Sequence, residues 1–361
     1  MNTIFERFHL QLFAEAGTLV NSLTNGYVNA HTGATETTTA LDPQLKAFYD
    51  TELLENARMT MVYAQFAKKQ ALPKNHGKTV EWRKWNTFAK ADKLQEGVIP
   101  TGQKMGSSVK TGSIDQYGTY AAVTDILEMR AYDDVILGAT EEMGASAGET
   151  QETLIRDALL TNGNILYCDN ITLATGAVAS TPTSPATMEA TTTVMSILTP
   201  DMVAKAVTIL KKNKVPTIGG KYVAVVHPSV AYDLRKSDAW VEAHKYASPN
   251  EIYNGEIGEL HGVRFVEATH APILGGTDYK NKAGGVTYAT YFFGKDSFGI
   301  IDPEGGALEM IVKDKSQVGG PLNQFSTIGY KFETNGATIL YPERLLRVMS
   351  CSSYSAVDEA N

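Results

Sequence analysis

DILEMRAYDDVILGATEEMGASAGETQETLIRDALLTNG, residues 125–163, is the stretch around which the chain is organised. Apolar residues recur in it every three or four positions, which places them on one face of a helix. Asp125 and Glu128 have the spacing of a capping box, and Asn162-Gly163 is typical of a left-handed stop. One helix over this stretch would be about 55 Å long. A rod of that length favours a structural subunit over an enzyme.

The same stretch also allows two shorter helices. Gly144 and Gly148 lie in its interior, and each interior glycine costs a helix about 1 kcal/mol. A break near these glycines is therefore the alternative prediction. A single long helix with a kink would be consistent with both predictions.

Composition limits the classes of protein that fit. The 361 residues suffice for two or three domains, and 43% of them are hydrophobic, enough for a sizeable core. The net charge of -8 argues against a general polyanion binder. Two cysteines, Cys168 and Cys351, fit a reducing compartment and exclude a disulfide scaffold. The N-terminus is a poor signal peptide, and no apolar run is long enough to span a membrane.

The segments before the long helix divide into an arm, a helix and a hairpin. Residues 1–40 are rich in Thr, Asn, Gly and Ala, which predicts an extended arm that orders against a neighbour. Asp42-Pro43 opens a predicted helix that Pro73 ends. Strand-like runs at 78–88 and 108–126 flank a turn-rich crest, which predicts a long hairpin. Because an isolated hairpin is only marginally stable in water, we expect this one to pack against another surface. The alternative is an ordinary hairpin at a sheet edge.

Basic residues gather in this part of the chain. Nine of them stand against two acidic residues, Glu81 and Asp92, so residues 58–93 carry about +7 and the remainder about -15. A basic hairpin on an acidic body predicts contacts between subunits, and contact with nucleic acid is the second reading. A solvated face is the plain alternative. The candidate contact residues are Arg58, Lys68, Lys69, Lys74, Lys78, Arg83, Lys84, Lys90 and Lys93.

The second half alternates strands with two helices. Residues 165–198 are rich in Thr, Ala and Ser and are predicted to be mostly loop. Thr199-Pro200-Asp201 caps a helix, KYVAVVHP predicts a buried strand, and Pro228 starts a short helix. Further strands are predicted in the segments 262–268, 286–293, 307–313, 326–334, 337–343 and 344–350.

The search for catalytic chemistry gives one motif, Gly144-Ala145-Ser146-Ala147-Gly148, which matches G-x-S-x-G. A nucleophile elbow needs a strand and a sharp turn before the serine, whereas helix-pattern sequence precedes Ser146. The histidines have no metal-ligand spacing, and His227 is predicted to end a buried strand. No catalytic, cofactor or metal site is predicted.

Several stretches together resemble the major capsid proteins of tailed bacteriophages with the Hong-Kong-97-type fold. The resemblance runs from about residue 41 to 348, and its specificity comes from the order and span of the stretches. The opening LQLFAEAG at 10–17 is similar to phage head proteins of Gram-positive hosts. The main stretches lie at 48–86, 142–159 (EMGASAGETQETLIRDAL), 221–240 (KYVAVVHPSVAYDLRKSDAW), 250–268, 292–299 (FFGKDSFG) and 319–331 (GGPLNQFSTIGYK).

This resemblance implies an α+β fold and a role for each segment. It implies an N-terminal arm at 1–40, an N-terminal helix at 41–75 and an extended loop hairpin at 76–124. A peripheral domain follows at 125–214, with its spine helix at 125–163. An axial domain at 215–295 and return strands of the peripheral domain at 296–361 complete the subunit.

The function implied is a major capsid protein that assembles itself into hexamers and pentamers of an icosahedral shell. That shell would enclose double-stranded DNA without sequence specificity, and it would assemble in the host cytoplasm. Portal, scaffolding and decoration proteins are further partners that the resemblance allows; no membrane and no cofactor are expected. Two rivals are an encapsulin-like compartment shell and a serine hydrolase using Ser146.

Overall fold

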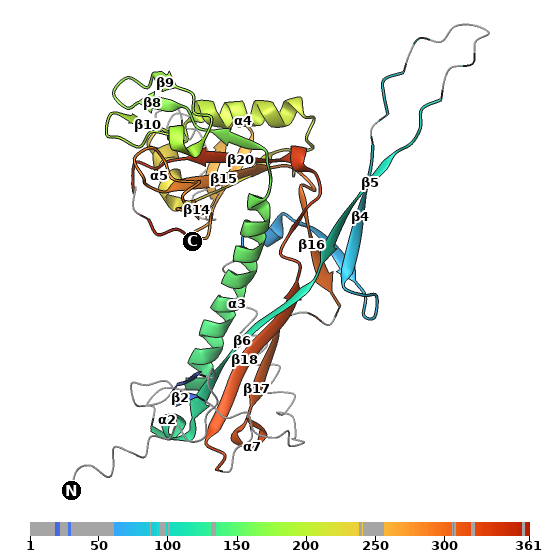
Figure 1. Cartoon of the computed structure of the whole chain (residues 1–361), viewed down its shortest axis with the longest axis vertical. Coiled ribbons are helices and arrows are strands. Elements are labelled where there is room, and N and C mark those ends of the chain that lie inside the picture. Colours follow the sequence, from blue (N-terminus) through green and yellow to red (C-terminus); the bar gives the residue numbers. More distant parts are fainter. Residues whose placement is uncertain are drawn as a thin grey trace.

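The computed structural model describes residues 61–361, apart from 87, 92, 94–98, 100–101, 131–134, 238–239, 241–255, 305, 307, 319–321 and 356–357, together with two short strands at 19–21 and 28–29. Two lobes are joined by one long helix, and a hairpin projects away from both (Figure 1). None of the helices in this described part combines the length and apolar content that a membrane span requires.

The joining helix is α3, Val135–Leu160, with a short helix α2, Asp125–Arg130, before it. α3 is 26 residues long, about 39 Å, and runs unbroken through Gly144 and Gly148, so the predicted break at these glycines is wrong. Tertiary packing compensates for the glycines, since Met143 and Ala147 of α3 are buried against Ile328 of a sheet. Residues 131–134, where one continuous helix would have to join α2 to α3, lie outside the described part.

Both predicted ends of this helical stretch are wrong in detail. At the start, Thr124 Oγ1 accepts the Leu127 N–H at 3.3 Å, while the Glu128 carboxylate pairs with Lys315 at 2.9 Å, so Asp125 and Glu128 form no capping box. At the end, neither Asn162 nor Gly163 has a positive φ. The Asn162 side chain instead donates to the Leu345 carbonyl at 2.6 Å, so a long-range hydrogen bond replaces the local stop.

The upper lobe contains a seven-stranded mixed sheet with the order β12-β13-β11-β15-β20-β7, and β14 pairs with β15. Helix α4, Pro200–Lys212, and helix α5, Pro228–Lys236, contribute to its largest hydrophobic core. Thr199 Oγ1 accepts the Met202 N–H at 3.4 Å, which confirms the predicted cap. The strands are β7 Ile165–Tyr167, β11 Tyr222–Val226, β12 Glu256–Leu260, β13 Val263–Glu267, β14 Ile273–Leu274, β15 Thr287–Phe293 and β20 Leu345–Ser350.

The lower lobe is a five-stranded sheet packed on α3. β18, Phe325–Thr334, pairs antiparallel with β6, Asp115–Thr124, over ten positions. Ile328, Tyr330 and Phe332 of β18 form a buried cluster with Met143 and Ala147 of α3. The remaining elements are β17 Glu309–Lys313, α7 Lys315–Val318, and the short strands β1 Leu19–Asn21 and β2 Val28–Asn29.

A third sheet connects the lobes to the hairpin and contains the main error of the sequence-based prediction. The helix expected to continue to Pro73 is absent from residues 61–72, which form a 3-10 turn, η3 Tyr63–Gln65, and a strand, β3 Lys68–Leu72. β3 pairs parallel with β16, Phe298–Pro303, and β16 pairs with β19, Thr338–Ile339. Pairing with a strand far away in the sequence overrides the local helical period. Residues 41–60 lie outside the described part.

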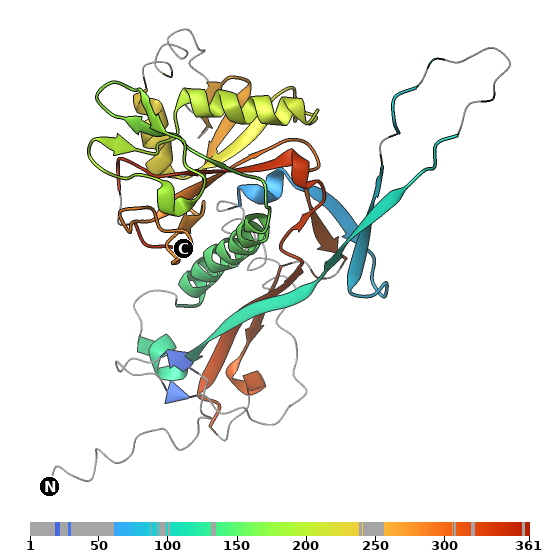
Figure 2. The ribbon, with the colours of Figure 1, turned by 45° about the horizontal axis from the view of Figure 1, so that its top comes forward.

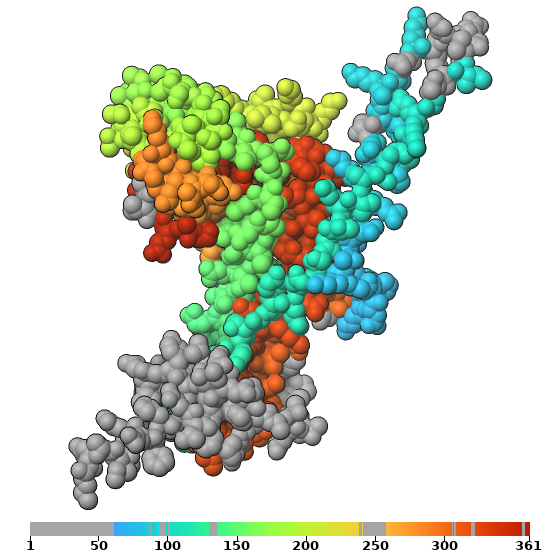
Figure 3. All heavy atoms as spheres, viewed as in Figure 1, coloured from blue at the N-terminus to red at the C-terminus, as the bar shows by residue number. Residues whose placement is uncertain are grey.

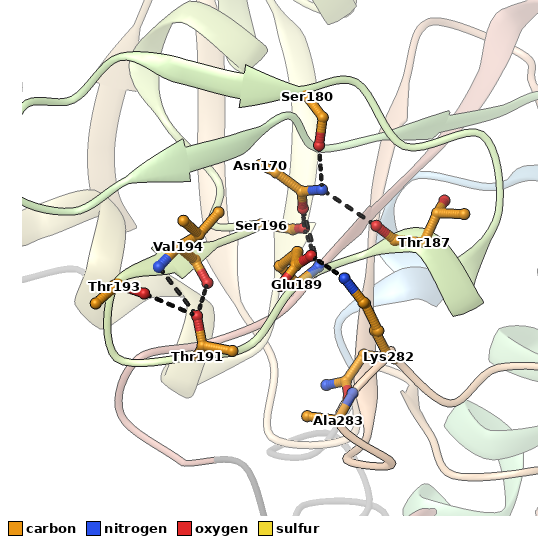
Figure 4. Close-up of polar contacts among 11 residues, drawn as sticks. Asn170, Ser180, Thr187, Glu189, Thr191, Thr193, Val194, Ser196, Lys282 and Ala283 are labelled. Atoms are coloured by element: carbon orange, nitrogen blue, oxygen red, sulfur yellow. Dashed lines mark hydrogen bonds and ion pairs between the residues drawn. The ribbon is translucent and has the colours of Figure 1, made fainter.

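The segment predicted to be mostly loop contains a small three-stranded sheet as well. Its strands are β8 Asn170–Thr172, β9 Val178–Ser180 and β10 Val194–Met195. The buried Asn170 side chain donates to Ser180 Oγ at 2.8 Å and to the Thr187 carbonyl at 3.1 Å, and it accepts from Ser196 (Figure 4). One amide thus joins three parts of this segment through polar contacts, which apolar periodicity does not reveal.

Candidate intersubunit surface

The hairpin is formed by β4, Thr79–Trp85, and β5, Ser107–Ser113, paired in register from Thr79–Ser113 to Trp85–Ser107. Residue 114 separates β5 from β6, so the returning strand leads directly into the lower sheet. Two views agree that the hairpin leads away from both lobes (Figures 1 and 2). As spheres it forms a thin projection beside the body (Figure 3).

One face of the hairpin is anchored to the body at its root. Trp82 is 8% exposed and forms a cluster with Ile114, Ile301 and Leu340. Gly112, which pairs with Val80, lies diagonally across from Trp82, and a Cβ there would come within 2.8 Å of the Trp82 ring. The absence of a side chain at Gly112 therefore lets the indole lie flat against the returning strand.

Lys84 strengthens the same root electrostatically. Its ammonium pairs with Glu343 and lies 4.7 Å from the centroid of the Tyr341 ring, which the Arg344 guanidinium approaches at 3.8 Å. Burial opposes ionisation of Glu343, but the hydrogen bond and charge of Lys84, the carboxyl's own backbone N–H and the charge of Arg344 together outweigh it and hold the pKa of that carboxyl below its ordinary value. The pair therefore contributes at neutral pH, and its contribution falls as the pH drops below the carboxyl's ordinary range.

The other face of the hairpin, and its distal part, are exposed and carry several large apolar residues among the charged ones. Side chains alternate across a strand, so Arg83 and Trp85 point away from the face that carries Trp82 and Lys84. The exposed large apolar residues here are Trp85 (59%), Phe88 (55%), Ile99 (93%), Met105 (53%) and Val109 (47%). A projection that leaves such residues in water is typical of a surface that a partner covers.

The predicted basic residues fall in several places. Arg58 lies outside the described part, Lys68 and Lys69 are exposed on β3, and Lys74 is exposed in the turn before β4. Lys78 pairs with Asp115 at 2.6 Å, where both side chains are largely exposed. Arg83 and Lys84 lie on β4, and Lys90 and Lys93 are exposed in the distal hairpin.

Two further basic residues of the hairpin, Lys104 and Lys110, were missed by the sequence-based prediction. Both are exposed, and Lys110 is paired with Trp82 across the two strands. The charge window ended at Lys93, although the second strand had been predicted from Ser108. Over residues 74–115 eight basic residues stand against four acidic ones, so the whole hairpin is basic.

Ser146 does not lie where a nucleophile would. It is in the middle of α3, and its Oγ is 3.1 Å from the Tyr330 hydroxyl of β18. A nucleophile elbow requires a strand, a sharp turn and then a helix, and this position has none of those transitions. The hydrogen bond instead fastens the helix to the lower sheet.

Replacing Ser146 with alanine is therefore expected to lower the free energy of unfolding by about 0.5–1.5 kcal/mol, the usual value of one hydrogen bond. Shell formation should be retained. Urea unfolding followed by circular dichroism measures the change, and Tyr330→Phe, which removes the other partner, is the matched control. A loss of esterase activity on replacing Ser146, with stability unchanged, would contradict this assignment.

The histidine and metal predictions can be compared with the structure as well. His227 follows β11 and caps α5, because its Nδ1 accepts the Ser229 N–H at 3.2 Å, and burial lowers the pKa of its ring. This confirms the prediction that His227 ends a buried strand. Among the described residues there is no group of three His, Cys, Asp or Glu side chains placed to hold a metal ion.

Phage capsids are among the solved structures that are similar to this one. The capsid of cyanophage P-SCSP1u matches with a TM-score of 0.56 at 14% identity, over 92% of this chain and 93% of that one. The capsid of cyanophage Pam1 gives 0.60 at 13%, over 89% and 96%. The capsid of Helicobacter pylori bacteriophage KHP30 gives 0.60 at 10%, over 90% and 95%. The predicted α+β fold of the Hong-Kong-97 type is confirmed.

The sequence itself identifies the family. The family model described as phage capsid protein matches residues 108–332, which is more than half of the chain. This chain therefore belongs to the phage capsid protein family. No curated protein matches it in sequence.

Proposed function

We propose that this chain assembles with copies of itself into hexamers and pentamers of an icosahedral shell that encloses the phage's double-stranded DNA. Assembly would take place in the cytoplasm of the bacterial host. Each subunit makes several modest contacts, and a closed shell is stable because those contacts are repeated around it. Closed symmetry is what prevents such contacts from growing into open filaments.

The proposal rests on the hairpin, which is fixed to the body at its root and exposes large apolar residues elsewhere. Its root is fixed to the body through Trp82 and Lys84, whereas Trp85, Phe88 and Met105 are exposed. Such apolar area is stabilised only when a partner covers it, at about 25 cal/mol per Å² removed from water. A second copy of the chain is the partner that a shell provides. The hairpin's lysines would then meet the more acidic remainder of a neighbouring subunit.

The segments take the roles that the resemblance implies. Residues 1–40 would be an arm crossing a neighbour, and residues 76–124 the loop overlapping the adjacent subunit. Residues 125–214, with the spine helix, would be the peripheral domain, and residues 215–295 the axial domain at the capsomer centre; within 125–214, β7 and α4 pack with the upper lobe. The resemblance assigns residues 296–361 to the return strands of the peripheral domain. They contribute β18 to the lower sheet and β20 to the upper one.

The charge balance supports a shell that encloses DNA without binding it tightly. About -15 lies outside residues 58–93, so surfaces away from the hairpin are on average repelled by phosphate. Portal, scaffolding and decoration proteins are partners that this role allows. A compartment shell enclosing enzyme cargo is the alternative, and the match to the phage capsid family favours the DNA-containing shell.

The test is to express the full chain alone and to examine it by sedimentation and negative-stain electron microscopy. We expect hollow closed particles or rings of five or six subunits. Particles purified from infected cells should contain double-stranded DNA protected from nuclease, which separates a phage head from a cargo compartment. A chain that stays monomeric at high concentration, with or without the other phage head proteins, would contradict the proposal.

A further inference from the structure

A buried carboxylate lies where α3 meets the segment that leads to the hairpin. Glu152 is 1% exposed. Both of its carboxylate oxygens accept the Tyr63 N–H at 3.1 Å, and the neighbouring N–H dipoles of Val62 and Ala64 also favour its ionised form. Three consecutive backbone donors of the η3 turn therefore converge on one side chain of the spine helix.

This turn connects Glu152 mechanically to the hairpin root. Tyr63 is fully buried and packs edge-on against Tyr291, with ring centroids 5.9 Å apart. Phe66 packs against Phe293 at 5.6 Å, and β3 begins two residues later. Leu72, at the end of β3, contacts the cluster that holds Trp82. Docking of residues 62–66 on α3 therefore sets the position of β3 beside the root.

We propose that Glu152 is a proton-linked latch, whose protonation strengthens and whose ionisation weakens the docking of residues 62–66 on the spine helix. The latch acts through β3 on the seating of the hairpin. It is separate from the contacts that the hairpin makes with other subunits.

The sign follows from the surroundings of the carboxylate. Burial raises the pKa of Glu152 to about 7, because three N–H dipoles offset only part of the cost of removing its charge from water. The pKa in the docked state therefore exceeds the ordinary value of a glutamate. The stabilising effect of the proton is fully present below that ordinary value, and it is lost as the pH rises through about 7.

The phenols and guanidinium groups around the latch keep their protonation state over this range, and His270, which lies 3.7 Å from Glu149 one turn before Glu152, is a further titratable neighbour that the Glu152→Gln comparison controls for. Burial raises the pKa of Tyr63 and Tyr291 well above the ordinary value for a phenol. Arg156 is buried on the same helix and donates to Asp157 at 2.9 Å, and Arg347 of β20 donates to the Leu160 carbonyl at 2.7 Å. Arginine stays protonated at any pH in question. Among the phenols, the guanidinium groups and the Glu152 carboxyl, Glu152 is the one that titrates near neutrality.

Hydrogen exchange tests the latch in the full-length chain. Amide exchange of the peptide spanning residues 61–67 is measured by mass spectrometry from pH 5.5 to 8.5 and corrected for the intrinsic tenfold rise per pH unit. In the wild type we expect the corrected rate to rise at least fivefold across pH 7. Glu152→Gln, which stays neutral, should remove this rise and keep the segment protected throughout. Glu142→Gln, at an exposed position on the same helix, should leave the rise unchanged.

A flat corrected rate in the wild type, or an equal rise in Glu152→Gln, would overturn the proposal. If Glu152→Gln does not fold, the carboxyl carbon shift of Glu152 in the wild type gives the answer directly. A titration midpoint near 7 supports the latch, and a midpoint at or below 5 overturns it.

Discussion

Removal of residues 89–104, with Phe88 joined to Met105 through an Asn-Gly turn, is expected to abolish shell formation and to leave a folded subunit. The deletion takes away the distal hairpin, including exposed Ile99, Lys90 and Lys93. The paired strands β4 and β5 and the buried root lie outside the deletion. Asn-Gly is the preferred two-residue connection between antiparallel strands, so the shortened hairpin should close.

The expected effect is large because each contact is repeated in every subunit. Fully burying a large apolar side chain such as Ile99 at an interface is worth about 1.5–3 kcal/mol, and a shell loses that amount many times over. Size-exclusion chromatography with light scattering measures the assembled fraction, which we expect to fall from nearly complete to below about a tenth. Circular dichroism and thermal unfolding should match those of the unassembled wild type.

Two further variants test whether the aromatic residues of the hairpin form an interface or are merely exposed apolar residues. Trp85→Ser with Phe88→Ser removes two exposed aromatic side chains of the hairpin and should also prevent assembly. Val178→Ser removes an equally exposed apolar residue, 58% accessible, on the small sheet of the upper lobe. Val178→Ser should assemble as the wild type does. Shells of normal size from the deletion variant would show that the hairpin is not the contact that holds subunits together.

Elements set by local pattern could be predicted from the sequence. The apolar stripe of α3, the Thr199 cap of α4 and the strands β13, β15, β17, β18 and β20 are confirmed, because each combines a clear period with nearby turn or cap residues. The hairpin was predicted from two strand-like runs around a crest, and its strands pair as β4 and β5.

The errors share a physical cause, since each concerns a feature that a distant partner determines. β3 has the sequence KKQAL and is a strand only because β16, more than two hundred residues later, pairs with it. The small sheet depends on hydrogen bonds of Asn170 with loops. Asn162 was predicted to stop a helix through its backbone, whereas its side chain holds Leu345.

The sequence indicated the basic charge of the candidate surface better than it indicated which residues form that surface. Part of the excess basic charge lies on the hairpin, but the charge gave no way to tell Lys84, which is used at the root, from Lys90, which is exposed. The exposed aromatic side chains were the stronger signal, and one of them, Trp85, was visible in the sequence three residues after the buried Trp82. Alternation along a strand places two residues three positions apart on opposite faces. Which of the two faces is buried depends on the parts of the chain that pack against the strand, and the sequence does not give that.

Trp82→Ala is expected to lower the free energy of unfolding by about 3–5 kcal/mol, the cost of removing a large buried aromatic side chain. The cavity would open where Ile114, Ile301 and Leu340 meet, and the hairpin would lose its fixed direction. Urea unfolding gives the free energy, and limited proteolysis at residues 73–79 reports loosening of the root. Trp82→Phe keeps a ring, and since the indole N–H has no hydrogen-bond partner among the described residues, it sacrifices no polar contact. It should lose less than about half as much.

The matched control for this variant lies three positions along the same strand. Trp85→Ala removes the same side chain from an exposed position, and exposed substitutions usually change stability by less than about 0.5 kcal/mol. We therefore expect a crossed result: Trp82→Ala unfolds readily, whereas Trp85→Ala is as stable as the wild type yet assembles poorly. Equal losses of stability from both would mean that the two faces of the hairpin are not divided between body and neighbour. The division matters for the shell, because a contact made through a projecting hairpin transmits force only if its root is rigid.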